Sequence, residues 1–144
     1  MNKVVSVKNG KLVIDKNIIY INMDKEFCCD KIVFENHSDE NYLLVGFSNN
    51  GDNPTEYIIL QKALSFDEQD KKLGMDTYYL EYYFGEDTLA GYGICKKIIT
   101  LDKEIIFQFK SNKLNIECLK IDIEKQFEIY NSTSFRKIFD DIYK

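Results

Sequence analysis

The amino-acid sequence predicts an α+β fold that is mostly β, built from antiparallel sheets. Many short β-rich runs follow one another at close spacing, and turn signals rather than long helices separate them. Only two segments carry a helical pattern, a short one at about 66–73 and a C-terminal one at about 132–143. The chain has 144 residues, one proline and no linker-like stretch, so we expect a single domain over 1–144.

The first part of the chain has the pattern of successive strands. Asn9-Gly10 separates two β-rich runs and strongly favours a hairpin, because both residues tolerate the positive φ angles of a type I′ turn. Further strands are expected at 18–23, 31–36, 41–48 and 56–61.

The short helix is predicted from its capping residues. Ser65 is a suitable N-cap, Glu68 three residues later completes a capping box, and Gly74 suits the left-handed position after the last turn. We expect Phe66 and Leu73 to dock this helix on the sheet.

Residues 77–84 predict a strand whose two faces differ. One face carries Tyr78, Leu80, Tyr82 and Phe84, and the other carries Thr77, Tyr79, Glu81 and Tyr83. After a glycine-rich turn (GYG, 91–93), runs at 97–101 and 104–110 predict a hairpin across 102–103. Alternating apolar residues predict an amphipathic strand over 120–130, although Lys125 interrupts the pattern.

The C-terminal helix is predicted from apolar residues at helical spacing, with Asn131 or Ser132 as its cap. Its apolar face consists of Phe135, Ile138, Phe139, Ile142 and Tyr143.

Composition argues against several functional classes. The net charge is −5 and Arg136 is the only arginine, which disfavours nucleic-acid binding. No apolar run reaches the roughly 18 residues of a membrane span, and no secretory signal pattern is present, so we expect no membrane association and a cytoplasmic location. The cysteines lack metal-ligand spacing and His37 is the only histidine, so we expect free thiols, no metal and no cofactor.

Catalytic motifs are not evident in the sequence. His37 lies in a polar, loop-like run, and neither a nucleophile elbow nor a phosphate-binding loop occurs. Carboxylate pairs such as Asp67 with Asp70 can in principle perform acid–base chemistry. We therefore expect no enzymatic activity.

A patch of tyrosines and acids is the candidate binding surface. Tyrosine suits protein interfaces because its ring brings a large contact area while its hydroxyl still forms hydrogen bonds. The candidate partner-binding residues are Asp67, Glu68, Asp70, Tyr79, Glu81 and Tyr83. Two simpler interpretations stay open. In one, the tyrosines serve core or sheet packing; in the other, the acids of 67–70 only favour the first turn of a helix.

The order of these motifs resembles the immunity protein 10 family. The segments FDEQD (66–70), LGMDTYYLE (73–81) and GYGI (91–94) carry the resemblance, together with GFSN (46–49), EYIILQKAL (56–64) and FRKIF (135–139). It spans about 32–143, whereas residues 1–30, an N-terminal β extension, have no recognised counterpart. Lys62 stands where the family has an arginine-like position.

The resemblance implies a non-enzymatic bacterial protein that neutralises a toxin by binding. Its partner would be the C-terminal catalytic domain of a cognate polymorphic toxin, bound in the cytoplasm. Two alternatives remain: a ligand-binding or enzymatic β domain with an aromatic pocket lined by Tyr78, Tyr82 and Tyr92, and an adaptor that self-associates through a sheet edge. The sequence leaves the oligomeric state open.

Overall fold

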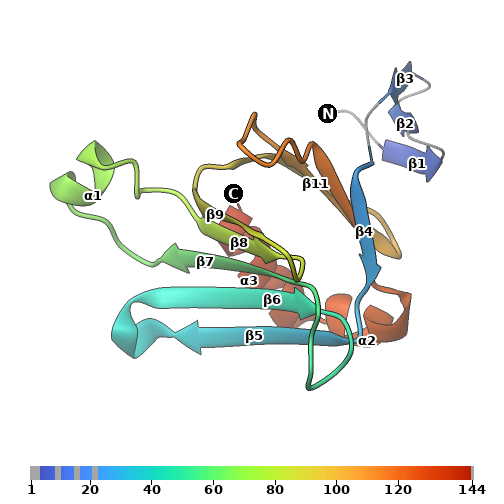
Figure 1. Cartoon of the computed structure of the whole chain (residues 1–144). Coiled ribbons are helices and arrows are strands. Elements are labelled where there is room, and N and C mark those ends of the chain that lie inside the picture. Colours follow the sequence, from blue (N-terminus) through green and yellow to red (C-terminus); the bar gives the residue numbers. More distant parts are fainter. Residues whose placement is uncertain (1–3, 9–10, 15–16, 21–22, 144) are drawn as a thin grey trace.

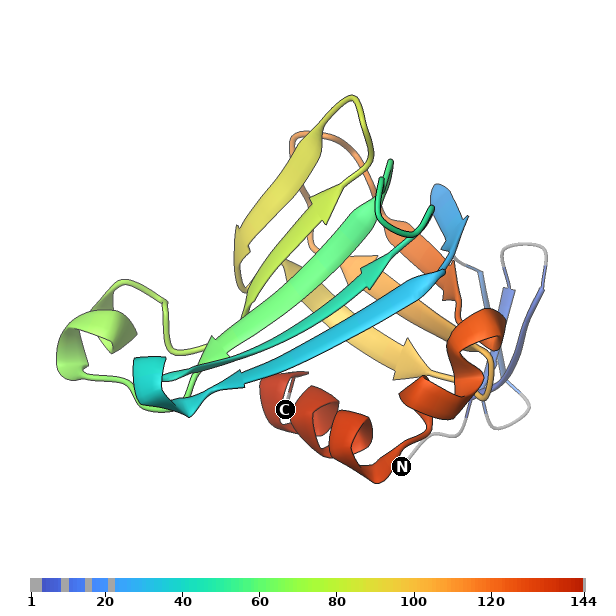
Figure 2. The same ribbon diagram turned by 90° about the horizontal axis from the view of Figure 1, so that it is seen from below.

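The computed structural model describes residues 4–8, 11–14, 17–20 and 23–143 (Figure 1). Its architecture is α+β with strands predominating, as the sequence predicts. Two sheets contribute side chains to one core, and a third, smaller sheet lies at the N-terminal end. Helix α3 (Thr133–Tyr143) packs on the largest sheet (Figure 2).

The largest sheet contains five antiparallel strands that lie in the same order as in the chain. Because each strand pairs with its sequence neighbour, every connection within this sheet is local. The strands are β5 (Lys31–His37), β6 (Tyr42–Ser48), β7 (Tyr57–Ala63), β8 (Tyr79–Tyr83) and β9 (Thr88–Tyr92), with the 3₁₀ turn η1 (Ser38–Glu40) between β5 and β6. The four strands predicted at 31–36, 41–48, 56–61 and 77–84 are confirmed, with ends that shift by a residue or two, whereas the fifth strand, β9, was not predicted and includes part of the expected glycine-rich turn.

The second sheet has the order β10-β11-β12-β4. The predicted hairpin across 102–103 is confirmed, with Thr100 opposite Ile105. The outermost pair departs from the antiparallel pattern, because β4 runs parallel to β12. These two strands are far apart in sequence, so no hairpin sets their relative direction. The strand bounds are β10 (Cys95–Thr100), β11 (Glu104–Phe109), β12 (Cys118–Asp122) and β4 (Lys25–Cys28).

The small third sheet is formed by the N-terminal strands β1 (Val4–Lys8), β2 (Lys11–Ile14) and β3 (Asn17–Tyr20) in that order. Lys8 lies opposite Lys11, so the predicted pairing of the first two strands is confirmed. The turn residues Asn9 and Gly10 themselves lie outside the described residues.

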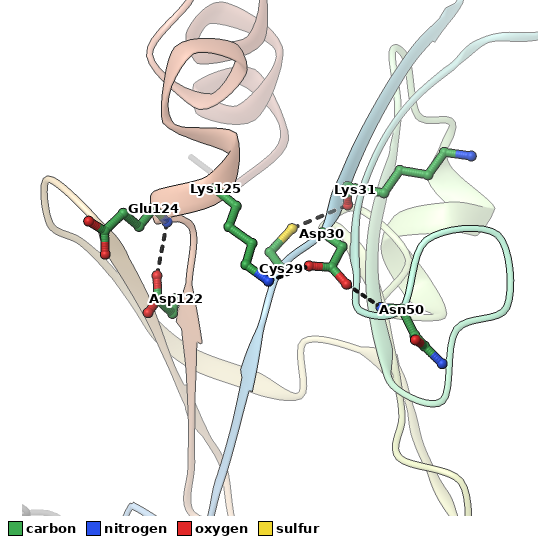
Figure 3. Close-up of polar contacts among 7 residues, drawn as sticks. All are labelled: Cys29, Asp30, Lys31, Asn50, Asp122, Glu124 and Lys125. Atoms are coloured by element: carbon green, nitrogen blue, oxygen red, sulfur yellow. Dashed lines mark hydrogen bonds and ion pairs between the residues drawn. The ribbon is translucent and has the colours of Figure 1, made fainter.

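The chain crosses between the two large sheets at two corners. At the first, the Cys29 amide donates a hydrogen bond to the Asp122 carbonyl (2.7 Å). The Asp30 carboxylate accepts a hydrogen bond from the Asn50 amide (2.8 Å) and lies 3.4 Å from the Lys125 ammonium (Figure 3). At the second, Gly93 joins β9 to β10 with a φ of 65°, which glycine adopts without steric cost. These corners hold the two sheets against one core.

Aromatic side chains fill the space between the sheets and α3. The ring centroid of Phe47 lies 6.5 Å from that of Phe107 in the second sheet, 5.8 Å from that of Phe135 and 5.9 Å from that of Phe139. All four side chains are essentially inaccessible to solvent. The predicted apolar face of α3 is confirmed for Phe135, Phe139 and Ile142, which are buried, and for the half-buried Ile138, whereas the side chain of Tyr143 lies outside the described residues. The Ser132 hydroxyl accepts a hydrogen bond from the Phe135 amide (3.3 Å) as the expected cap.

Helix α1 (Glu68–Lys72) is shorter than predicted and begins at a different cap. Asp67, not Ser65, is the N-cap, and Asp67 and Asp70 form the capping box through mutual hydrogen bonds of 2.8 and 3.0 Å. Ser65 instead donates its hydroxyl to the Asn41 side chain. The expected docking of Leu73 is wrong, because this side chain is 64% exposed.

The predicted strand over 120–130 is only partly correct. Strand β12 ends at Asp122, whose carboxylate accepts a hydrogen bond from the Glu124 amide (2.9 Å) and turns the chain. The remaining residues form the 3₁₀ turn η2 (Glu124–Gln126) and helix α2 (Phe127–Tyr130). The alternating pattern of apolar residues continues past Asp122, but the sheet ends there and the chain turns toward α3. Alternation alone does not show where a sheet ends.

Candidate partner-binding face

The largest sheet has one covered face and one open face. Buried residues such as Leu60, Leu80 and Tyr82 point toward the core and α3. We call the opposite side the outer face; within the part of the chain that the structure describes, no helix or sheet is layered over it (Figures 1 and 2). Its central residues are Tyr42, Leu44, Tyr57, Ile59, Gln61, Tyr79, Glu81, Tyr83 and Tyr92.

The alternation predicted for β8 positions the candidate tyrosines on this outer face. Leu80 and Tyr82 are fully buried, while Tyr79, Glu81 and Tyr83 are half-buried on the other side. Of the two sets of tyrosines, the one with Tyr82 faces the core, whereas Tyr79 and Tyr83 pack against neighbouring rings on the outer face of the sheet.

Glu81 links two tyrosines of the outer face. Its carboxylate oxygens accept hydrogen bonds from the Tyr57 hydroxyl (2.6 Å) and the Tyr79 hydroxyl (3.0 Å). The hydrogen bond to Glu81 is the main reason that the pKa of Tyr57 is raised to about 12. The pKa of Tyr79 is also raised, first by burial and then by its hydrogen bond to Glu81.

Ring contacts extend this network along the face. Tyr57 and Tyr83 stack with centroids 5.3 Å apart, and Tyr79 meets Tyr92 edge-on at 5.5 Å. Tyr83 also donates its hydroxyl to the Gly85 carbonyl (3.3 Å). Neighbouring side chains thus restrain each ring, which lowers the entropy lost when a partner covers the face.

An open cleft lies where the outer face meets the segment that carries α1. Its volume is about 280 Å³. The side chains that give it its chemistry are Glu40, Tyr42, Gln61, Asp70, Tyr79 and Tyr92. We call it the α1 cleft.

The structure brings together only some of the predicted site residues. Asp70 and Tyr79 both line the α1 cleft, and Glu81 and Tyr83 lie beside Tyr79 on the same strand. Asp67 is occupied in the capping box, which agrees with its interpretation as a helix-start residue. Glu68 is exposed on α1 and lies 3.6 Å from the Lys71 ammonium, so neither Asp67 nor Glu68 lines the cleft.

Sequence reasoning missed two tyrosines of the outer face, Tyr42 and Tyr57, as well as the exposed Leu73. Tyr57 lies opposite Tyr83, and Tyr42 lies opposite Ala63, relationships that depend on the pairing register. A period-two pattern in β7 indicates which side Tyr57 takes, but only the register shows which tyrosines it meets.

The aromatic pocket of the ligand-binding alternative is not formed by its predicted residues. Tyr82 is fully buried, stacks on Phe109 with centroids 6.2 Å apart and donates its hydroxyl to Glu56 (2.8 Å). Tyr92 lies on the opposite side of the sheet and is 43% exposed. The two rings therefore cannot line one pocket.

The potentially reactive groups include buried thiols and His37, which lies beside the α1 cleft. Burial raises the pKa of the Cys29 thiol to about 11 and that of Cys118 to about 12, so both are protonated at neutral pH. His37 stacks on Tyr42 with centroids 4.5 Å apart, and its hydrogen bond to Glu35 (3.0 Å) raises its pKa. His37 also lies close to Asp39 and Glu40. These two exposed carboxylates add negative charge beside the cleft.

None of the described helices combines the length and apolar character needed to cross a membrane.

Comparison with known proteins identifies a family for this chain. Searches of the curated proteins and of the solved structures find no match. The family model described as immunity protein 10 matches residues 29–133, which begins after β4 and ends before the FRKIF segment of α3. This match covers most of the chain, and the chain therefore belongs to the immunity protein 10 family.

Proposed function

We propose that this protein binds and neutralises a cognate bacterial polymorphic toxin domain in the cytoplasm, by covering it rather than by catalysing a reaction. Family membership supports the role of an immunity protein. The observation that supports the binding mode is the outer face, where Tyr57 and Tyr79 donate hydrogen bonds to Glu81 and Tyr83 stacks on Tyr57. No layer covers this face in the described structure.

The outer face has the composition of an interface centre. A stable complex buries about 800 Å² on each partner, and a few central residues carry most of its affinity. We assign this role to Tyr79, Glu81 and Tyr83, with Asp67, Glu68 and Asp70 forming an acidic margin on the α1 side. Tyrosine and acidic residues in this arrangement fit a partner with basic side chains.

The exposed Leu73 extends this surface beyond the sheet. Helix α1 and its flanking loops project from the body of the molecule beside β7 and β8 (Figures 1 and 2). A leucine that is 64% exposed at the end of a projecting helix gives a partner an apolar contact that the chain itself does not use.

The N-terminal residues and the rest of the chain have different roles in the fold. We propose one domain with an immunity-protein core over 32–143, to which the N-terminal strands add a β extension. The separate three-stranded sheet of β1–β3 supports this view, whereas β4 forms part of the second sheet of the core.

Co-expression tests the function directly. The toxin domain encoded beside this gene is expressed from an inducible promoter, with this chain or with an unrelated immunity protein as the control. We expect this chain alone to restore growth and to co-purify with the toxin domain. Growth arrest despite abundant folded chain contradicts the proposal.

Purified components separate binding from catalysis. If neutralisation occurs by covering the toxin, the toxin domain is released unmodified and regains activity after the complex is dissociated in denaturant and refolded. A covalent change in the recovered toxin domain, detected as a shift of its intact mass, contradicts the binding mechanism.

A further inference from the structure

The α1 cleft combines aromatic surface with carboxylates. Tyr42 and Tyr79 come from the sheet, Tyr92 from its edge strand, Glu40 from η1 and Asp70 from α1. Among the described residues that line the cleft there are two acids and no lysine, arginine or histidine. The cleft therefore presents ring surfaces and negative charge together without a cation of its own.

The surroundings strengthen the negative potential. Asp39 lies beside Glu40 in η1, and Glu35 lies on the adjacent strand β5. The pKa of Tyr42 is raised by burial first and then by the charges of Glu40, Glu35 and Asp39. The nearby side chains that can carry positive charge are His37, which stacks on Tyr42 and is hydrogen-bonded to Glu35, and two lysines. Lys71, which lies 3.6 Å from Glu68, and Lys72 are both exposed on α1. Lys62 reaches the Asp141 carbonyl of α3 on the inner side of the sheet.

Arginine is the side chain that matches these features. Its planar guanidinium stacks on aromatic rings and donates paired hydrogen bonds to carboxylates, whereas a lysine ammonium is a compact point charge. A volume of about 280 Å³ is ample for one such side chain and its backbone. The cleft also opens onto the outer face, because Tyr79 belongs to both.

We propose that the α1 cleft binds an arginine side chain of the toxin domain, held between the cleft tyrosines and the carboxylates of Glu40 and Asp70. This inference rests on the proposed function for the identity of the partner. It specifies the chemistry of one contact within the larger interface.

Binding to the toxin domain is measured for the unsubstituted chain and for the variants Glu40→Gln and Tyr92→Ala. Both side chains are exposed, so the fold should persist, and thermal unfolding checks it. Asp70 is not substituted, because its carboxylate also accepts a hydrogen bond from the Asp67 amide, and its loss would disturb the capping box of α1. Glu128→Gln, an exposed acid on α2 at the far end of the molecule, is the matched control (Figure 1).

We expect each cleft variant to weaken binding by about tenfold or more, and Glu128→Gln to leave it unchanged. If the unsubstituted chain binds the toxin domain and both cleft variants bind equally well, the cleft inference is wrong while the proposed function stands. If the unsubstituted chain does not bind the toxin domain, the proposed function is wrong.

A small probe examines the cleft independently of the toxin. N-acetyl-arginine methylamide is titrated into the chain while the ring resonances of Tyr42, Tyr79 and Tyr92 are followed by NMR. We expect saturable shifts confined to these rings, absent with the uncharged citrulline analogue and reduced in Glu40→Gln. Equal shifts with the citrulline analogue, or no shift with either probe, overturn the assignment of the cleft as an arginine site.

Discussion

Tyr57 donates a 2.6 Å hydrogen bond to Glu81 across the β7–β8 pair, although the two residues are not directly opposite each other. Glu81 faces Ile59, and Tyr57 faces Tyr83. The contact is therefore diagonal, a separation that long side chains span on one face of a sheet. The Glu81 carboxylate therefore links β8 to β7 through Tyr57, while its other oxygen accepts a hydrogen bond from Tyr79 of its own strand.

This diagonal contact predicts the alkaline titration of Tyr57. The pKa of Tyr57 is raised from 10.0 to about 12, which means that the folded state favours the protonated hydroxyl. The stabilisation of the folded state by this protonated hydroxyl is fully present below pH 10.0 and is lost as pH rises through about 12. We expect Glu81→Gln to lower this pKa toward the ordinary value. Titration of ¹³C-labelled tyrosine rings by NMR measures the change, with Glu68→Gln on α1 as the control. An unchanged Tyr57 titration in Glu81→Gln contradicts this account.

Leu73 provides a test of the projecting α1 segment. We expect Leu73→Ala to weaken toxin binding by about tenfold without lowering the melting temperature, because the side chain is 64% exposed and packs on little of its own chain. Ile129→Ala is the matched control, since Ile129 is 42% exposed on α2 away from the outer face. Affinity is measured by calorimetry. Equal affinities for the two variants exclude Leu73 from the interface.

Phe47 is expected to be the most sensitive core position. Its ring contacts Phe107, Phe135 and Phe139, so its loss affects both sheets and α3. We expect Phe47→Ala to lower the free energy of unfolding by about 3–5 kcal/mol, as large aromatic truncations do. Phe34→Ala, at a ring that is 38% exposed and touches Phe135, should cost clearly less. Urea unfolding compares the two, and similar losses argue against a central role for Phe47.

Truncation distinguishes the N-terminal sheet from strand β4. We expect removal of residues 1–22 to leave the melting temperature almost unchanged, because β1–β3 pair only with one another among the described strands. Removal of residues 1–30 also deletes Phe27 and Cys29, which are buried in the core, and leaves one edge of β12 without its partner strand. We therefore expect this longer truncation to unfold at a much lower temperature. A large loss from the shorter truncation would show that the small sheet supports the core.

The sequence by itself determined the elements that depend on local chemistry. Glycine and capping residues located the turns and helix starts approximately, although Asp67 rather than Ser65 caps α1 because its carboxylate reaches the Asp70 amide. Helical spacing identified the buried face of α3, and period-two alternation assigned Tyr79 and Tyr83 to the side opposite Tyr82. The motif order also indicated the family that the comparison confirms.

Only the tertiary structure decided which residues from distant segments meet. The parallel pairing of β4 with β12, the end of β12 at Asp122 and the exposure of Leu73 depend on where the sheets end and which surfaces remain uncovered. The α1 cleft likewise joins Glu40, Asp70 and Tyr92, residues whose proximity arises from strand register and from the path of the α1 segment. Local patterns report the preferred conformation of a segment and the side that it buries, whereas its neighbours are set by the energetics of the whole core.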